Sequence, residues 1–357
     1  MNSYTSKLKI KESEAAILCE SYAPLKIAKI KLPDKLLDSQ ILVELISSGI
    51  CGAQINEIDA RKGVDKFLPH LLGHEGYAVV VQVGPKVTKV KKGDEVVLHW
   101  RPSIGKQSMP PKYVWNGKIV NAGWVTTFNR HAVVSENRIT KIISGLDPDF
   151  IPLLGCSLTT AYGVVNYESN LNFKDSLLLF GFGGVGVAIL KFAKINGVKH
   201  ITVVDLHDGK KELALKAGAD YFIPFTSKAK TLNALSSVFS ENGNPNICID
   251  TTGNTSAIEI CYEISSEIAK IILLGVPKIG EKVSIYTLPL HFGKILTGTQ
   301  GGSTEPDRDI QKILALLKAK KISYNDFATM SYDFSNINAA INDLREGMPY
   351  RPIIKFN

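Results

Sequence analysis

The amino-acid sequence predicts an α/β protein with two domains, one built on a doubly wound parallel sheet and the other a barrel-like β domain. Three observations predict this class. A glycine-rich turn joins an apolar strand to an apolar helix within residues 177–193. Strand-like and helix-like segments alternate over residues 158–298, whereas short β-rich runs fill residues 14–99. The length of 357 residues exceeds what one hydrophobic core usually supports.

The barrel-like β domain is predicted from the runs that precede residue 100. Aliphatic and β-branched residues dominate these runs, and turn pairs such as Gly84-Pro85 and Gly93-Asp94 separate them. The runs occupy residues 15–19, 41–46, 77–83 and 95–99. Short strands divided by turns at this spacing are typical of a small barrel.

The parallel sheet is predicted from apolar strands that alternate with longer helical segments. These strands occupy residues 177–180, 201–204, 247–250 and 271–274. Two helix-like segments follow, at residues 309–318 and 336–345, and a closing strand at 352–356. We expect this tail to return to the β domain. The predicted domains are residues 1–157 with 300–357, and residues 158–299.

A glycine-rich turn connects the first strand of the sheet to the next helix, in the segment Gly181-Phe182-Gly183-Gly184-Val185-Gly186. The first glycine permits a tight turn, the second lets the backbone approach a pyrophosphate, and the last allows close packing of helix on strand. Gly184 and Val185 begin the helix, whose first N–H groups have no partner within it and bind phosphate. The segment therefore predicts a dinucleotide site.

The identity of the dinucleotide depends on Asp205, which follows the second predicted strand. Its distance from the glycine turn is close to the roughly twenty residues at which a carboxylate accepts hydrogen bonds from the ribose diol. The same charge repels a 2′-phosphate. We therefore expect the cofactor to be NAD rather than NADP.

Two cysteines and a histidine predict a metal site. Cys51, Gly73-His74-Glu75 and Cys156 offer thiolate, imidazole and carboxylate ligands. Structural zinc sites fill four positions from closely paired cysteines, whereas catalytic sites use three protein ligands and keep one position open. The sequence has no C-x-x-C pair. We expect one catalytic zinc on Cys51, His74 and Cys156, with Glu75 in the same site.

The formal net charge of +8 favours no particular partner. The lysines are scattered without interleaved aromatic residues, so we expect no nucleic-acid partner and a solvated surface, with attraction of an anionic cofactor or substrate left open. No apolar run approaches the roughly 18 residues of a membrane span, and residues 1–11 lack a signal-peptide core. Five cysteines form no disulfide-like pattern, and we expect a cytoplasmic protein.

Taken together, the motifs resemble those of the zinc-type medium-chain alcohol dehydrogenases, in the medium-chain dehydrogenase/reductase superfamily, over nearly the whole chain. The glycine turn and Asp205 follow the ligands in the family's order. The other matching segments are Ser48-Gly49-Ile50-Cys51-Gly52, Gly73-His74-Glu75-Gly76, Leu154-Gly155-Cys156 and Tyr350-Arg351-Pro352. The resemblance implies a GroES-like β-barrel catalytic domain, formed by both ends of the chain around a central Rossmann domain.

The resemblance also implies roles for single residues. Lys210 would approach the adenosine ribose and Arg351 the cofactor pyrophosphate, while Ala53 and Trp100 would lie in the substrate pocket. Glu75 would lie just behind the metal or ligate it transiently. The implied activity is zinc-dependent hydride transfer between NAD and an alcohol, with an aldehyde or ketone on the other side of the reaction.

Substrate and assembly are less closely specified. The Trp100-Arg101 pair and the positive charge favour a polyol, a sugar or an anionic alcohol among the family's small-molecule substrates. Residues 297–302 resemble the family segment that pairs across a two-fold axis. This implies a homodimer, with a tetramer as the alternative.

The chain departs from the family pattern in the helix-like stretch after the first ligand. Ala53 stands where the family usually has a proton-relaying Ser or Thr, and Asn56 where many relatives have a histidine. Gln54 replaces the acid that orients the zinc-binding histidine. The proton must then leave through ordered water, a substrate hydroxyl, Glu57 or His99.

A second departure concerns the family's structural zinc. Its four closely spaced cysteines are missing from residues 101–124, so we expect no second zinc. We predict that this segment forms a long loop near the pocket or the subunit interface.

Two other functions remain open. One is a zinc-free quinone or enoyl reductase of the same superfamily, against which Cys51, His74 and Cys156 argue. The other is a non-catalytic NAD-binding protein with a sensing role, for which the missing hydroxyl at Ala53 is the only support.

Overall fold

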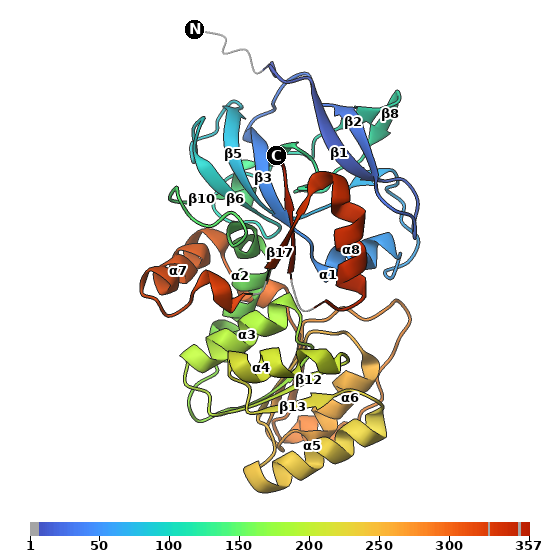
Figure 1. Cartoon of the computed structure of the whole chain (residues 1–357), viewed down its shortest axis with the longest axis vertical. Coiled ribbons are helices and arrows are strands. Elements are labelled where there is room, and N and C mark those ends of the chain that lie inside the picture. Colours follow the sequence, from blue (N-terminus) through green and yellow to red (C-terminus); the bar gives the residue numbers. More distant parts are fainter. Residues whose placement is uncertain (1–6, 328, 349–350) are drawn as a thin grey trace. The chain divides into compact units, whose positions relative to one another are not determined.

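The computed structural model describes residues 7–327, 329–348 and 351–357, and its chain divides into two compact units (Figure 1). The barrel unit comprises residues 1–157, 305–315 and 329–357, and the parallel-sheet unit comprises residues 158–304 and 316–328. The sequence-based division also separates the units after residue 157. The sequence-based division places residues 300–304 and 316–328 in the barrel-like domain, whereas in the structure they belong to the parallel-sheet unit.

The barrel unit contains two sheets. A five-stranded sheet has the order β4-β1-β2-β7-β8, and a seven-stranded sheet runs β10-β6-β5-β3-β18-β17 with β9 also paired to β3. Among the described residues, the strands of these two sheets pair antiparallel except for β17 with β18. The bounds are β1 Glu12–Leu18, β2 Lys26–Lys31, β3 Gln40–Gly49, β4 His70–Leu71, β5 Glu75–Val83, β6 Glu95–His99, β7 Tyr113–Trp115, β8 Lys118–Val120, β9 His131–Ser135, β10 Ile139–Lys141, β17 Thr329–Asp333 and β18 Arg351–Lys355.

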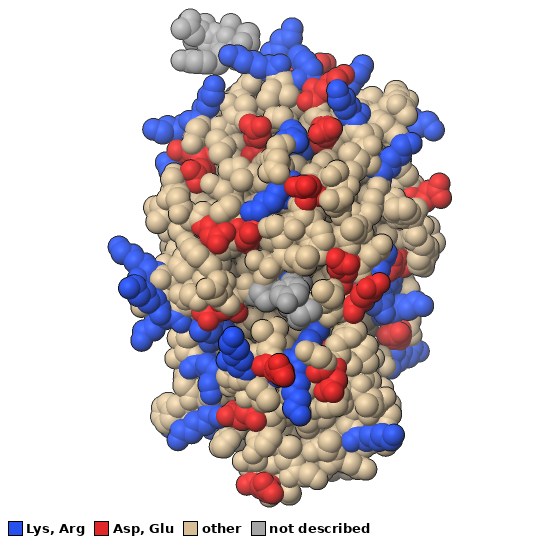
Figure 2. Space-filling view, in the orientation of Figure 1, with Lys and Arg blue, Asp and Glu red and all other residues tan. Residues whose placement is uncertain are grey.

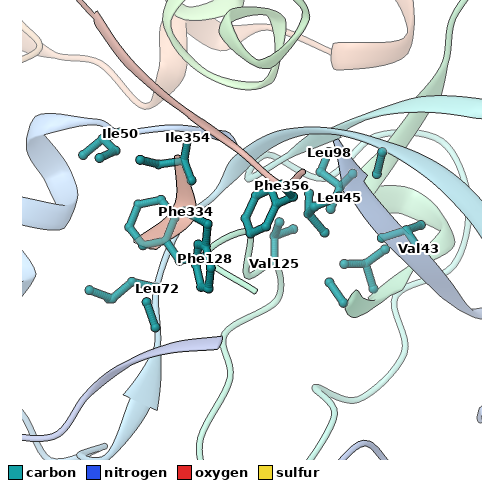
Figure 3. Packing of buried hydrophobic residues seen from close by; sticks show 14 of the residues in the cluster. Val43, Leu45, Ile50, Leu72, Leu98, Val125, Phe128, Phe334, Ile354 and Phe356 are labelled. Carbon is teal, nitrogen blue, oxygen red and sulfur yellow. The ribbon is translucent and has the colours of Figure 1, made fainter. Parts of the chain in front are cut away.

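Short helices complete the barrel unit and meet its core. They are α1 Gly52–Ile58, α8 Ile337–Arg345 and the first part of α7 Pro306–Lys318. Figure 3 shows Phe128, Phe334 and Phe356 among the apolar side chains of this core, with the last two rings 4.9 Å apart between centroids. Ile50 and Leu72 belong to the same cluster, so the core fixes the segments that lead to Cys51 and His74.

The parallel-sheet unit is built on six strands in the order β13-β12-β11-β14-β15-β16, every pair parallel. The chain winds outward in both directions from β11, so the crevice beside β11 and β14 is the topological switch point. The bounds are β11 Ser176–Phe180, β12 His200–Asp205, β13 Tyr221–Pro224, β14 Ile247–Asp250, β15 Lys270–Leu273, β16 Ile295–Gly298, α2 Ser157–Gly163, α3 Gly184–Ile195, α4 Lys211–Ala217, α5 Lys228–Asn242 and α6 Thr255–Ile264.

The helices of this unit cover both faces of the sheet. One core cluster joins Leu178 and Cys248 of the strands to Leu235 of α5 and Cys261 of α6. Figure 1 shows α3 and α4 on the opposite side of β12 and β13 from α5. The predicted α/β class, a doubly wound sheet together with a barrel-like β domain, is confirmed.

The cysteine-free segment 101–124 is more ordered than the long loop that the sequence suggested. Its second half forms the hairpin β7–β8, which extends the five-stranded sheet. Asn116 and Gly117 turn this hairpin with φ of 48° and 74°. Two positive φ angles are typical of the Asn-Gly hairpin turn, so the dipeptide was a signal for this hairpin.

Charged side chains of both signs mix on the face of the chain that Figure 2 draws. On the five-stranded sheet, Lys31 and Lys29 lie opposite Glu12 and Glu14 in the register of β1 and β2. Opposite charges at facing positions stabilise the strand pair and offset part of the excess of lysine. Among the described residues, no helix has the length and apolar character that crossing a membrane requires.

A half-buried polar network fastens the start of α7 to the barrel unit. Asp307 Oδ2 pairs with Lys89 Nζ at 2.6 Å, and Asp307 Oδ1 accepts a hydrogen bond from Thr140 Oγ1 at 2.7 Å. Burial alone would raise the pKa of Asp307, but the hydrogen bonds from Lys89 and Thr140 outweigh it and lower that pKa. The network therefore favours the ionised carboxylate in the folded protein.

Replacing Asp307 with Ala should lower the free energy of unfolding by about 1–3 kcal/mol, because Lys89 and Thr140 lose their acceptor. Since the folded pKa is lowered, the stabilisation is present at neutral pH and is lost as the pH falls through that value. Urea unfolding at pH 7, and at a series of pH values from about 4 downward, measures both effects, because the loss occurs below the ordinary aspartate pKa.

The control is Asp38→Ala, which removes an exposed pair with Lys86 and should leave the unfolding midpoint unchanged. Equal effects of the two substitutions would contradict the assigned role of Asp307.

Candidate functional site

Cys51, His74 and Cys156 converge in the barrel unit. One potential ligand atom from each lies within 4.8 Å of the others. Strands β3 and β5 pair antiparallel with Ser48 opposite Gly76, so the end of one and the start of the other lie side by side. This pairing brings Cys51, just after β3, close to His74, just before β5. The turn at residues 151–155 leads to Cys156.

Glu75 occupies the centre behind these three residues. It is fully buried, and its Oε1 accepts hydrogen bonds from Arg351 Nη2 at 2.5 Å and Nε at 3.1 Å. A Cβ on Gly49 would lie 2.2 Å from Glu75 Oε1, and one on Gly155 would lie 3.0 Å from the Glu75 side chain. The absence of a side chain at Gly49 makes room for the carboxylate, whereas at Gly155 it allows close contact with the Leu98 carbonyl oxygen and the Cβ of Glu75.

Glu75 and Arg351 therefore form a buried ion pair with each other. The contact of Arg351 with a cofactor pyrophosphate, and the role of Glu75 at the metal, stay predictions. Glu75 is not part of the three-residue ligand group, and its Oε2 has no hydrogen-bond partner. Burial raises the pKa of Glu75, and the Arg351 guanidinium opposes that rise. Tyr350, which precedes Arg351, lies outside the described residues.

The ligand atoms have the character that a metal requires. His74 Nε2 is buried without a hydrogen-bond partner, whereas Nδ1 lies 2.5 Å from Gln54 Nε2. A hydrogen bond from Cys156 and the nearby Arg351 lower the pKa of Cys51 well below that of a free thiol despite its burial. A thiolate beside an orphaned imidazole nitrogen is the chemistry of a Cys₂His zinc site with an open fourth position. The donor set fits a catalytic zinc.

The glycine turn of the parallel-sheet unit has the predicted geometry. Gly181 turns the chain at φ +91°, and Gly183 caps α3, which begins with Gly184 and Val185. A Cβ on Gly186 would lie 2.1 Å from the Gly181 carbonyl oxygen, so this helix packs directly on the turn. A Cβ on Gly183 would meet no protein atom within 4 Å. The open space at this helix N-terminus suits a phosphate.

Asp205 and Lys210 form an ion pair beside the turn. Lys210 Nζ lies 3.1 Å from Asp205 Oδ1, and each side chain is less than a tenth exposed. Asp205 Oδ2 also accepts a hydrogen bond from Phe182 N at 2.6 Å. The carboxylate is thus fixed at the end of β12, where a ribose would be expected.

The remaining predicted residues divide into two groups. Ala53 and Trp100 are both half-buried, the first on α1 and the second directly after β6. His99 is fully buried, with Nδ1 2.7 Å from the Arg101 carbonyl oxygen and Nε2 3.0 Å from Thr140 Oγ1. Burial lowers the pKa of His99 to about 4. Both ring nitrogens are engaged within the barrel unit, so His99 is removed as a proton relay.

Two glycines that were not predicted as site residues also shape the site. Gly49 admits the Glu75 carboxylate, and Gly155 allows close contact with the Leu98 carbonyl oxygen and the Cβ of Glu75. Each stands shortly before a ligand cysteine. Their position just before a ligand cysteine was the only sequence signal. Their role depends on which buried groups pack against them, and this is determined by the tertiary structure.

Two family models match the chain. The model for the alcohol dehydrogenase GroES-like domain matches residues 37–144, and the model for a zinc-binding dehydrogenase matches residues 184–319. Together they cover more than half of the chain. The chain belongs to the zinc-containing medium-chain alcohol dehydrogenase family. It is accordingly an oxidoreductase that acts on CH–OH groups, as the resemblance implied.

Curated relatives extend over almost the whole chain. The S-(hydroxymethyl)glutathione dehydrogenase of Komagataella pastoris is 27% identical over 96% of this chain and 97% of its own length. The NDMA-dependent alcohol dehydrogenase of Amycolatopsis methanolica is 25% identical over 96% of this chain and 98% of its own.

Solved structures agree with the fold. Benzyl alcohol dehydrogenase from Acinetobacter calcoaceticus superposes with a TM-score of 0.85 at 25% identity, covering 98% of this chain and 100% of its own. An alcohol dehydrogenase from E. coli CFT073, solved with NADH, gives a TM-score of 0.79 at 18% identity, covering 97% and 100%.

The glycine turn supplies a matched pair of substitutions. Gly186→Ala should lower the melting temperature, because its Cβ would overlap the Gly181 carbonyl oxygen. Gly183→Ala should leave the melting temperature unchanged but weaken NADH binding by about tenfold or more, because its Cβ would enter the space beside the phosphates. Thermal melting and NADH fluorescence titration separate the two effects. Wild-type NADH affinity in Gly183→Ala would contradict the assigned position of the cofactor.

Proposed function

We propose that this dehydrogenase binds one catalytic zinc through Cys51, His74 and Cys156 and transfers hydride between NAD and an alcohol. The convergence of the three ligands around a partnerless His74 Nε2 carries the proposal. Two thiolates and a neutral imidazole leave one coordination position for the substrate oxygen. The same ligands argue against a zinc-free quinone or enoyl reductase.

The bound zinc lowers the pKa of an alcohol or polarises a carbonyl. The chain's own residues hold the ligands in place for this chemistry. Glu75 and Arg351 fix the backbone on either side of the ligands through their buried ion pair. We assign Glu75 a positioning role behind the ligands. Arg351 would contact the cofactor pyrophosphate only through guanidinium N–H groups that do not donate to Glu75.

NAD supplies the hydride acceptor when it is bound. The N–H groups at the start of α3 would bind its pyrophosphate, and Gly183 leaves space for that approach. Asp205 would accept hydrogen bonds from the ribose hydroxyls and would disfavour a 2′-phosphate, while Lys210 lies beside the carboxylate.

The substrate class proposed is a polyol, a sugar or an anionic alcohol. The Arg101 guanidinium lies 5.7 Å from the centroid of the Trp100 ring, the predicted pocket residue. Lys62 lies close enough to Glu57 to lower its pKa, and Glu57 is close enough to His74 for their charges to interact. The cations beside Trp100 and Glu57 favour a substrate that carries negative charge or many hydroxyls.

Glu57 is the proposed proton acceptor in place of the missing hydroxyl at Ala53. The two residues are four positions apart on α1, so they share one face of the helix. Burial raises the pKa of Glu57, and the charges of His74 and Lys62 counteract that rise. A raised carboxylate pKa brings the group nearer to the pH at which it exchanges protons with an alcohol.

A homodimer is proposed from the edge of the parallel sheet. Strand β16 is the last strand in that sheet, and Ile295 on it is 48% exposed. Tyr286 and Phe292, which precede it, are each 70% exposed. An uncovered apolar edge strand favours pairing with a second copy. We place the enzyme in the cytoplasm, because a reducing compartment preserves the two ligand thiols.

Elemental analysis of protein purified without chelator should find about one zinc per chain, and the preparation should reduce NAD with at least one alcohol, polyol or sugar derivative. Cys156→Ser should lose the zinc and the turnover. Cys19→Ser, which changes a cysteine outside the ligand group, should keep both.

Absence of zinc together with absence of turnover would refute this function. Zinc without turnover on a broad panel would favour the non-catalytic, sensing alternative.

Glu57→Gln should slow alcohol oxidation by about 100-fold at neutral pH, because an amide cannot accept the proton. In the wild type the rate should fall as the pH drops through the raised pKa of Glu57, since the protonated carboxyl no longer accepts. Profiles of kcat against pH measure this fall, which forms the acid limb of the profile. The surface substitution Glu20→Gln is the control and should leave the acid limb unchanged. An unchanged acid limb in Glu57→Gln would exclude Glu57 from the proton route.

A further inference from the structure

Gln54 connects two of the three ligand residues through one side chain. It is 1% exposed and stands in the first turn of α1. Its Oε1 accepts a hydrogen bond from the Cys51 backbone N–H at 2.9 Å, and its Nε2 lies 2.5 Å from His74 Nδ1. A single carboxamide therefore fixes both the start of α1 and the orientation of the imidazole.

The two ends of this carboxamide are not interchangeable. The Cys51 N–H can only donate, so it requires Oε1, and Nε2, which can also only donate, then faces His74 Nδ1. In this arrangement Nδ1 accepts. A neutral imidazole carries one proton, which must then be on Nε2, the nitrogen that has no partner.

Metal binding requires the opposite position of the imidazole proton. A metal at Nε2 needs the lone pair of that nitrogen, so the ring proton must move to Nδ1. Nδ1–H and the Gln54 amide N–H₂ then point at each other. Rotating the amide by half a turn provides an acceptor for Nδ1–H but turns N–H₂ onto the Cys51 N–H. The oxygen and the nitrogen of the amide face different partners, so in either orientation only one of the two donors, Cys51 N–H or His74 Nδ1–H, faces the oxygen.

We propose that Gln54 is a positioning residue that weakens zinc binding, so that the metal leaves this enzyme more readily than it would beside a carboxylate. The inference rests on the proposed zinc site. Glutamate is the discriminating replacement, because it has the same length and two oxygens. One oxygen accepts from the Cys51 N–H and the other from His74 Nδ1–H, so no donor is left without a partner.

The test is equilibrium competition for zinc between the protein and a chromophoric chelator. Gln54→Glu should bind zinc about 10- to 100-fold more tightly than the wild type, the usual size of such an effect. The matched control is Gln40→Glu. Gln40 is also buried, but its amide bonds Leu37 N and the Met109 carbonyl, so zinc affinity should stay at the wild-type value.

Equal or weaker zinc binding by folded Gln54→Glu would overturn the inference. Failure of the proposed zinc site looks different. In that case the wild type and Cys51→Ala would hold equally little zinc in the same assay.

A second measurement needs no variant at Gln54 and therefore does not depend on the folding of Gln54→Glu. Histidine labelled with ¹⁵N in the wild type reports which ring nitrogen carries the proton, and loss of one signal in His74→Gln assigns it. The proton should be on Nε2 without zinc and on Nδ1 with zinc. A proton on Nδ1 in both states would show that Oε1 already faces the ring and would overturn the inference.

Discussion

The buried ion pair between Glu75 and Arg351 is the constraint on which the metal site depends. An unpaired charge at this depth would cost several kcal/mol, so the fold must bring both residues together. Glu75 follows His74 directly, and its carboxylate fills the space that Gly49 leaves. Arg351 begins β18, which pairs with β3. The pair thus joins the segment that carries His74 to β18.

Local motifs are the reason why much of the site was predictable from the sequence. Each ligand has a distinctive neighbourhood, and the glycine turn stands between an apolar strand and helix. Strand β2 was not predicted, because its lysines interrupt the apolar alternation. The hairpin at Asn116-Gly117 was not predicted either, because residues 101–124 were assessed only for the absence of zinc-binding cysteines. The partners of His99, Arg351 and Gln54 depend on tertiary packing, which no local pattern encodes.

The departures from the family pattern are concentrated in α1, a helix of seven residues. Ala53 stands where the family usually has a hydroxyl, Gln54 where it has an acid, and Asn56 where many relatives have a histidine. Glu57, half-buried on the same helix, is the proposed proton acceptor. The three ligand residues still converge. Under the proposed function, one short element would change both the handling of the proton and the hold on the metal, while the ligand set is retained.

X-ray absorption at the zinc edge of the purified enzyme tests the central claim most directly, because it counts the atoms bound to the metal. Ligation by Cys51, His74 and Cys156 predicts two sulfur atoms at about 2.3 Å, one imidazole nitrogen at about 2.0–2.1 Å and one further light atom. Four sulfur atoms, or a shell of oxygen and nitrogen alone, would contradict the account and place the zinc elsewhere.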